Sequence, residues 1–326
     1  MPESQLILNR NMPRNVVVSF KGETTKADPG PPVILDWRSE YQYMVLVEHG
    51  RWRFSDLQLG TRQKTQRQGF CSEGTSSLLE LENIRIRNAS TAGAGIAAQR
   101  GGRTHLYGKI ELNEDLHDEC KDLETYSRVY AGDHGTVQFV GQGPGTLLSV
   151  GHGSLSTDYY GCIRLGCERA KITTWDPGGN NLGIANSGRI DLHGTETHLR
   201  GMHEEAGLIG LEDDGHILAE ETHVILEHCK SRHAIYLQKA SKVFGGPFEM
   251  RGKFQSSVVT MSGSVFGGTV TGDVTEIHAY TGSHITLESR SSKPTGRVVA
   301  DSGASITLPS GKVVREQSIP PGGQPK

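Results

Sequence analysis

The sequence predicts an all-β protein whose chain winds into a β-solenoid, and three observations lead to this prediction. First, a small residue, any residue and then Ile or Val recur seven times between residues 160 and 310. Second, a short strand core lies six residues before each Ile or Val, so each unit has a strand, a tight corner and a second strand. Third, the units lie 18 to 27 residues apart without helical periodicity, which is typical of stacked coils that share one core. The seven residues predicted to face the core are Ile172, Ile190, Ile217, Val243, Val265, Ile285 and Ile306. The matching positions six residues earlier are Gly166, Ile184, Leu211, Leu237, Val259, Ala279 and Ala300.

Each part of this unit has a physical reason. An alternation such as Ile277-His278-Ala279 places every second side chain on one face of a sheet. A branched side chain packs well on that half-buried face, and a small residue suits a corner where the backbone turns sharply. A single coil leaves its inner face exposed, whereas a neighbouring coil stacked on it covers that face. Among solenoids, we predict a right-handed parallel β-helix.

The distribution of proline, glycine and strand patterns predicts three regions. Residues 1–32 are rich in proline around one strand-like run, and we expect a short anchoring or capping segment there. Residues 33–315 are predicted to form the β-helix, in which the polar stretch 113–130 is either helical or an excursion from the solenoid. Residues 316–326 end in a run of proline and glycine and are expected to form a flexible tail.

Composition narrows the classes of function. The chain has 326 residues, of which 42 are glycine and only 35% are hydrophobic, and a thin solenoid core with polar turns accommodates such a composition. No stretch is apolar over the roughly 18 residues that a membrane span requires, and the N-terminus lacks the pattern of an export signal. Five scattered cysteines favour reduced thiols and folding in a cytoplasm. Residues 111–228 carry 7 Lys and Arg against 21 Asp and Glu, which argues against nucleic acid as a partner.

A Gly-, Ser- and Thr-rich β-helix with a proline-rich lead-in and no export signal resembles bacteriophage tailspike and tail-fibre proteins. The resemblance covers residues 33–310 and is carried by the small-x-branched corner motif. It implies a virion fibre or spike, homotrimeric and folded in the bacterial cytoplasm, that contacts other virion proteins at its N-terminal end. It also implies recognition of a bacterial surface polysaccharide, which some members of the family cleave. Attachment to a phage-like head is as compatible with the sequence as attachment to a tail.

Acidic and histidine-rich stretches are the first candidates for chemistry. Glycosidases use two carboxylates roughly 5–9.5 Å apart, and three acid pairs could in principle meet across coils. These pairs are Glu204-Glu205, Asp213-Asp214 and Glu220-Glu221. Because they lie in glycine-rich, turn-like contexts, we interpret them as loop acids and predict no catalytic residue.

Metal and cofactor sites are not predicted either. Seven of the fourteen histidines lie between His193 and His233, but spacings of five alternate between sheet faces and do not match zinc motifs. Cys162 and Cys167 have the wrong spacing for a zinc knuckle and are expected to be two buried thiols.

Aromatic residues beside carboxylates are the stronger candidates, because sugar rings stack on aromatic faces. Tyr159 and Tyr160 follow Asp158, and Trp175 with Asp176 opens a Pro- and Gly-rich turn. The glycan-binding candidates are therefore Tyr159, Tyr160, Trp175 and Asp176. The alternative is that Tyr160 and Trp175 cap the core or fill a subunit interface.

The sequence thus favours a fibre subunit that binds a cell-surface polysaccharide without cofactor or metal. Two alternatives stay open: a polysaccharide hydrolase or lyase on the same fold, and a purely structural connector. A carboxylate pair in a groove beside the aromatic residues would favour the enzyme, whereas a flat apolar face would favour the connector.

Overall fold

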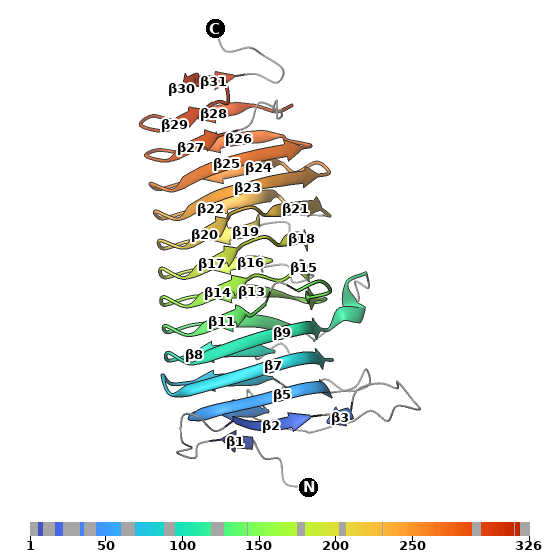
Figure 1. Cartoon of the computed structure of the whole chain (residues 1–326). Helices are drawn as coiled ribbons and strands as arrows, with labels where there is room; N and C mark the ends of the chain where they lie inside the picture. Colours follow the sequence, from blue (N-terminus) through green and yellow to red (C-terminus); the bar gives the residue numbers. More distant parts are fainter. Residues whose placement is uncertain are drawn as a thin grey trace. The chain divides into compact units, whose positions relative to one another are not determined.

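A computed structural model describes 6–8, 17–21, 33–35, 44–59, 69–87, 95–118, 127–141, 143–174, 180–201, 207–229, 231–288, 295–315 and 317–319. Within these residues all regular elements are strands, apart from one turn of 3-10 helix, η1 (Glu114–Leu116). The chain divides into two compact units, residues 1–173 and 174–326. In each unit parallel strands of successive coils stack into two sheets, which confirms the all-β solenoid (Figure 1). The right-handed winding stays a prediction.

In the first unit, one sheet contains a single short strand from each coil. These strands are β1 (Leu6–Leu8), β4 (Val45–Val47), β6 (Phe70–Glu73), β8 (Ile96–Gln99), β10 (Ser127–Ala131) and β13 (Gly153–Thr157). The second sheet contains longer strands, or two strands per coil. These are β2 (Val17–Lys21), β3 (Val33–Leu35), β5 (Gly50–Leu59), β7 (Ser77–Ile86), β9 (Arg103–Leu112), β11 (Thr136–Phe139), β12 (Leu147–Val150), β14 (Cys162–Leu165) and β15 (Arg169–Thr174). Inward side chains of both sheets, such as Phe70, Leu79 and Ile163, form the buried core between them.

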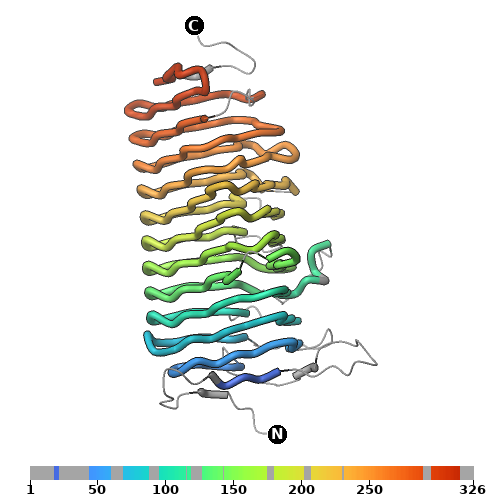
Figure 2. Tube along the Cα trace, in the orientation of Figure 1, coloured from blue at the N-terminus to red at the C-terminus, as the bar shows by residue number. Residues whose placement is uncertain are grey.

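The second unit repeats this arrangement. Its first sheet contains β16 (Leu182–Ile184), β19 (Gly207–Leu211), β22 (His233–Leu237), β24 (Ser256–Thr260), β26 (Glu276–Ala279), β28 (Val298–Ala300) and β31 (Gln317–Ile319). Its second sheet contains β17 (Arg189–Leu192), β18 (Glu196–Gly201), β20 (His216–Ala219), β21 (His223–His228), β23 (Lys242–Arg251), β25 (Val265–Gly272), β27 (His284–Leu287), β29 (Ser305–Thr307) and β30 (Val313–Val314). Figure 2 shows the regular path of the chain from coil to coil within this unit.

Burial is confirmed at six of the seven positions that were predicted to face the core. Ile172, Ile190, Ile217, Val243, Ile285 and Ile306 are all buried. Ile172 nevertheless belongs to β15, whose partner is β12, and so it lies in a different column from Ile190, which pairs with Ile217. Gly161-Cys162-Ile163 also fits the motif but was not among the seven instances, and its Ile163 pairs with Val137.

Val265 is the prediction that was wrong. Its neighbour Phe266 pairs with Val243 and with Ile285 and is fully buried, whereas Val265 is half-buried on the outer face. The strand before it shows the same shift of one residue, because Thr260 and not Val259 pairs with Leu237. The core position of this coil is aromatic, so a pattern restricted to Ile and Val selected the adjacent residue.

The corners between the two sheets explain the small residue of the motif. At several corners two consecutive residues with positive φ turn the chain and the small residue follows them, whereas Gly282 or Gly303 alone precedes Ser283 and Ala304. A Cβ atom on Gly161 would overlap the carbonyl oxygen of Ala131 in the preceding coil, and Gly135 meets Ala98 in the same way. The pairs with positive φ include Asp133 and His134, Tyr159 and Tyr160, Asn186 and Ser187, Asp213 and Asp214, and Lys239 and Ala240. Glycine is therefore required where coils approach most closely.

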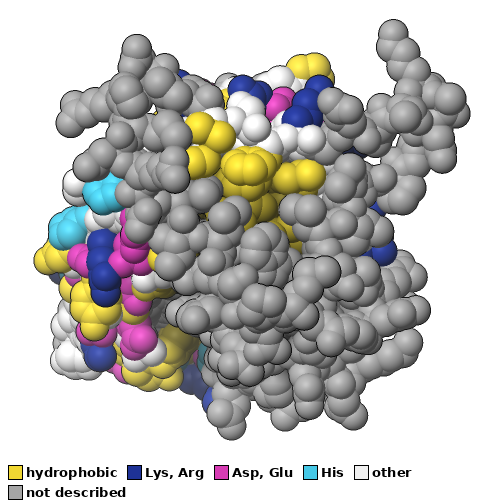
Figure 3. Space-filling model, turned by 90° about the horizontal axis from the view of Figure 1, so that it is seen from below, with side chains coloured by type: hydrophobic (Ala, Val, Ile, Leu, Met, Phe, Trp, Pro, Cys, Tyr) yellow, Lys and Arg dark blue, Asp and Glu magenta, His cyan; other side chains and the backbone are white. Residues whose placement is uncertain are grey.

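The N-terminal end of the first unit and the C-terminal end of the second unit differ in how their strands pair. At the N-terminal end β1 and β2 add to β4 and β5 in parallel, so strands within residues 1–32 stack on the first coil. Phe20 on β2 stays 40% exposed there and stacks on Phe54, and hydrophobic side chains reach the surface of this end (Figure 3). At the C-terminal end β30 and β31 pair antiparallel with β29 and β28, although residues 316–326 were expected to be a flexible tail. These antiparallel strands cover edges that would otherwise offer unpaired backbone groups.

Candidate functional site

Tyr159 and Tyr160 form the corner between β13 and β14 in the first unit. Their φ angles are 42° and 62°, and the amide of Gly161 donates to the carbonyl of Asp158 at 2.8 Å, which closes the turn. Side chains at the outside of such a corner cannot reach the core. Tyr159 and Tyr160 are accordingly 59% and 63% exposed, which makes them the most exposed large hydrophobic side chains of the described residues.

The corner of the preceding coil supports these tyrosines. The backbone amide of His134 donates to the carbonyl of Tyr159 at 3.0 Å, so the two corners are joined. The imidazole of His134 lies parallel to the ring of Tyr160, with centroids 5.2 Å apart and an interplanar angle of 7°. This stack restrains the Tyr160 ring, which lowers the entropy lost when a ligand orders it.

A second hydrogen bond fixes the start of the corner. The hydroxyl of Tyr130 on β10 donates to Oδ1 of Asp158 at 2.6 Å, and the guanidinium of Arg128 lies 4.8 Å from the centroid of the Tyr130 ring. Burial raises the pKa of Tyr130 strongly, and the bond to Asp158 adds to this, so the phenol stays a donor. Asp158 therefore serves to hold the corner, and Asp133 is an exposed carboxylate of the preceding corner.

The arrangement combines apolar ring surface with hydroxyl, imidazole and carboxylate groups on a rigid turn. Such a surface can stack on a sugar ring while polar groups bond to its hydroxyls. Trp175 and Asp176, the other two predicted residues, lie outside the described residues, and their role stays a prediction. His134 was not predicted, because it lies 26 residues before Tyr160 and only the coil register brings the two rings together.

The acid pairs behave as turn residues where they are described. Asp213 and Asp214 occupy a corner with φ of 51° and 60°, and Lys239 lies 3.2 Å from Asp213. A hydrogen bond with His216 holds the pKa of Asp214 below its usual range, assisted by Lys242 at 3.5 Å. Glu220 and Glu221 lie in the turn between β20 and β21, and Glu204-Glu205 lies outside the described residues. The described pairs therefore fit the interpretation as solvated loop acids.

Two of these histidines pair with carboxylates of the next coil. His198 contacts Glu227 at 2.7 Å, and His223 contacts Glu249 at 2.8 Å, on the outer face of β18, β21 and β23. The bond from Arg251 to Glu249 is the main reason that the pKa of Glu249 is lowered. Within the part of the chain that the structure describes, no three His, Cys, Asp or Glu side chains converge to hold a metal ion.

His233 at the start of β22 predicts a dependence of stability on pH. Burial lowers its pKa to about 4 from 6.5, and the charge of Arg232 contributes. Between these pH values the unfolded chain binds a proton that the folded chain does not, so stability rises as the pH increases from 4 to 6.5. A shift of this size corresponds to about 3 kcal/mol for a fully buried ring, and the partial exposure of His233 reduces the expected effect to about 1–2 kcal/mol.

Urea unfolding of His233→Gln over this pH range should therefore show a flatter profile than wild type. His193→Gln, at an exposed position of the same unit, is the control and should keep the wild-type slope. Equal slopes in wild type and His233→Gln would contradict the assignment.

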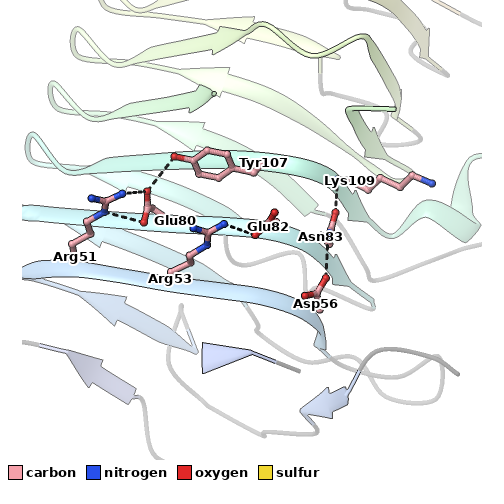
Figure 4. Close-up of polar contacts among 8 residues, drawn as sticks. All are labelled: Arg51, Arg53, Asp56, Glu80, Glu82, Asn83, Tyr107 and Lys109. Carbon is pink, nitrogen blue, oxygen red and sulfur yellow. Dashed lines mark hydrogen bonds and ion pairs between the residues drawn. The ribbon is translucent and has the colours of Figure 1, made fainter. Parts of the chain in front are cut away.

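Away from the corner formed by Tyr159 and Tyr160, the first unit carries an ordered polar network on the outer face of β5, β7 and β9 (Figure 4). Arg51 binds both carboxylate oxygens of Glu80, at 2.9 and 2.7 Å, and Tyr107 donates to the same carboxylate at 3.1 Å. Burial alone would raise the pKa of Glu80, but the bonds from Arg51 and Tyr107 together lower it. Arg53 pairs with Glu82 at 2.5 Å in parallel.

The same strands bend at a ladder of polar side chains. Asp56 and Asn83 have positive φ, and the Asn83 side-chain amide donates to Asp56 at 3.0 Å while its oxygen accepts from the backbone of Lys109 at 3.1 Å (Figure 4). Gly108 completes the column, because a Cβ there would overlap the Asn83 side chain. Both features serve the fold: they fix register and curvature of the sheet.

Comparison with models of known protein families, with curated proteins and with solved structures finds no match to this chain. Among the described residues, no helix has the length and apolar character needed to cross a membrane. Among the described residues, the four cysteines, Cys71, Cys162, Cys167 and Cys229, are not joined to one another by disulfide bonds.

Proposed function

We propose that this β-solenoid binds carbohydrate through the corner formed by Tyr159 and Tyr160, stacked on His134. The observation that carries the proposal is that two adjacent tyrosines, 59% and 63% exposed, form the pair with positive φ at one corner. At the other described corners with two such residues, the pair consists of small, polar or charged residues. Adjacent exposed aromatic rings with polar tips are typical of binding surfaces, where one part of the side chain is apolar and the other hydrogen-bonds. The ligand class is a polysaccharide, whose sugar rings offer an apolar face and peripheral hydroxyls.

The setting of the proposal is a fibre or spike on a phage-like particle that attaches to a bacterial surface polysaccharide. The stacked coils and the corner motif support the β-helical fold that this setting requires. Its homotrimeric state, its contact with virion proteins and its location on the particle belong to the same proposal. Binding without cleavage is favoured over hydrolysis, because Asp158 is held by Tyr130 and the acids at residues 213 and 214 are paired with lysines.

Replacing both tyrosines by asparagine should abolish most of the binding without unfolding the corner. Asparagine tolerates positive φ, so Tyr159→Asn and Tyr160→Asn remove the rings and keep the turn. By analogy with bases stacked on aromatic side chains, each lost stack weakens binding by about 1–3 kcal/mol, or roughly 5- to 150-fold in Kd. The measurement is calorimetric titration with a bacterial surface polysaccharide that binds the wild-type chain.

Ser262→Asn is a matched control, since Ser262 occupies a corner with φ of 53° in the second unit. It should bind as wild type does. Unchanged affinity of the double tyrosine variant would remove the corner from the binding site, and a large loss of thermal stability would instead show a packing role for the rings.

A further inference from the structure

Phe244 is an aromatic side chain on the outer face of the second unit that the core does not use. It lies on β23 and is 41% exposed. Its partners in register are Leu218 on β20 and Gly267 on β25. An outward position on a sheet normally carries a polar side chain, so an exposed phenylalanine here requires an explanation.

The ring of Phe244 lies across the backbone of Gly267. A Cβ atom built on Gly267 would be 2.9 Å from Cδ1 and 3.2 Å from Cε1 of the ring. Because a Cβ on a strand points away from the sheet, two ring carbons at this distance mean that the ring covers the glycine. Gly267 is buried by it, although it faces outward. A Cβ at position 267 would force the ring to shift from this position.

Polar groups continue the surface beside the ring. Thr286 on β27 pairs with Gly267 and is exposed. The Phe244 ring, the Gly267 backbone and the Thr286 hydroxyl therefore follow one another on successive coils, which are about 4.8 Å apart. In the next column, Val265 lies between Lys242 and His284. Lys242 is 3.5 Å from Asp214, so charge beside the ring is balanced.

The size of this surface indicates its occupant. A stable interface with a protein buries about 800 Å² on each partner. The exposed apolar surface here consists of one phenylalanine with the half-buried Leu218 and Val265, which suits one or two sugar rings. An uncharged pyranose offers an apolar face for the ring and hydroxyls for Thr286.

We propose that Phe244, seated on Gly267 and flanked by Thr286, is a second carbohydrate subsite that takes an uncharged pyranose. The proposal rests on carbohydrate binding as the function of the chain. It concerns the second unit, whereas the corner tyrosines belong to the first. A chain that extends along stacked coils can place its next residue over Thr286.

Titration of the full-length chain with maltohexaose, cellohexaose and chitohexaose tests this subsite. Phe244→Ala removes the ring, and Gly267→Ala keeps the ring but displaces it from its seat. Both should weaken binding of at least one of these neutral probes about tenfold or more and leave Tm within a few degrees of wild type. Thr286→Val should lose less affinity. Arg232→Gln, at an exposed position just before β22 in the other sheet of this unit, should bind as wild type does.

The outcomes separate the two proposals. Loss of affinity in both Phe244→Ala and Gly267→Ala, with the corner tyrosines intact, supports the subsite. If the wild-type chain binds a probe and these two variants bind it equally well, the subsite is overturned while carbohydrate binding stands. If the wild-type chain binds no probe and no polysaccharide, both proposals fall.

Discussion

Substituting Phe266 by Asp is expected to lower the free energy of unfolding by about 4 kcal/mol or more. The change removes a fully buried ring and places a charge between stacked coils. Phe266 packs against Phe248 with ring centroids 5.7 Å apart, and it lies in register with Val243 and Ile285. Chemical denaturation monitored by far-UV circular dichroism measures the effect. Ile285→Asp, in the same column, should cost a similar amount.

Val265→Asp is the matched control at the adjacent residue. Because Val265 faces outward between Lys242 and His284, an aspartate there stays hydrated and should change stability by less than about 1 kcal/mol. Equal destabilisation by the two aspartates would contradict the register of this coil, and the reverse order would restore the register expected from the Ile and Val pattern.

Substituting Arg51 by Ala is expected to have the second largest effect, about 2–3 kcal/mol. The Glu80 side chain is 2% exposed, so removal of Arg51 leaves a buried carboxylate with only Tyr107 as donor. The 44% exposure of the Arg51 side chain keeps the expected value below that for a fully buried pair. Arg53→Ala is the control, because its pair with Glu82 is more exposed and should contribute no more than about 1 kcal/mol.

The effect of Arg51→Ala should depend on pH in one direction. In the wild-type chain the pKa of Glu80 is lowered by its partners, so its stabilising contribution is present above the ordinary pKa of 4.5 and is lost as the pH falls through the lowered value. Without Arg51, burial favours the protonated carboxyl. The difference in unfolding free energy between wild type and variant should therefore narrow as the pH falls toward 4. A constant difference would show that Glu80 is not the group responsible.

The sequence predicted the fold because the corner imposes a strong local requirement. At corners such as Asp213-Asp214, a small residue follows two residues with positive φ, and a buried residue follows two positions later, as at Gly215 and Ile217. The same rule holds before residue 160, where Gly135 precedes the buried Val137. The pattern did not include Phe266 because it was restricted to Ile and Val. The core position requires a large apolar side chain, and an aromatic ring fills it as well as a branched aliphatic one.

The candidate site could be predicted only in part. Tyr159 and Tyr160 were visible as adjacent aromatic residues in a turn, but the ring of His134 joins them only through the pairing of one coil with the next. Phe244 and Gly267 are likewise 23 residues apart in the sequence, and their contact depends on the register of β23 and β25. To predict which residues of neighbouring coils meet, one must know the length of each segment between the strands, and no local sequence pattern specifies that length.

Binding of the full-length chain to an array of bacterial surface polysaccharides, with reducing-end analysis of the eluted glycan, tests carbohydrate recognition most directly. We predict that the wild-type chain retains at least one polysaccharide, that the double variant of Tyr159 and Tyr160 loses it, and that no new reducing ends appear. Failure to retain any polysaccharide, or the release of oligosaccharides from the retained one, would contradict binding without cleavage.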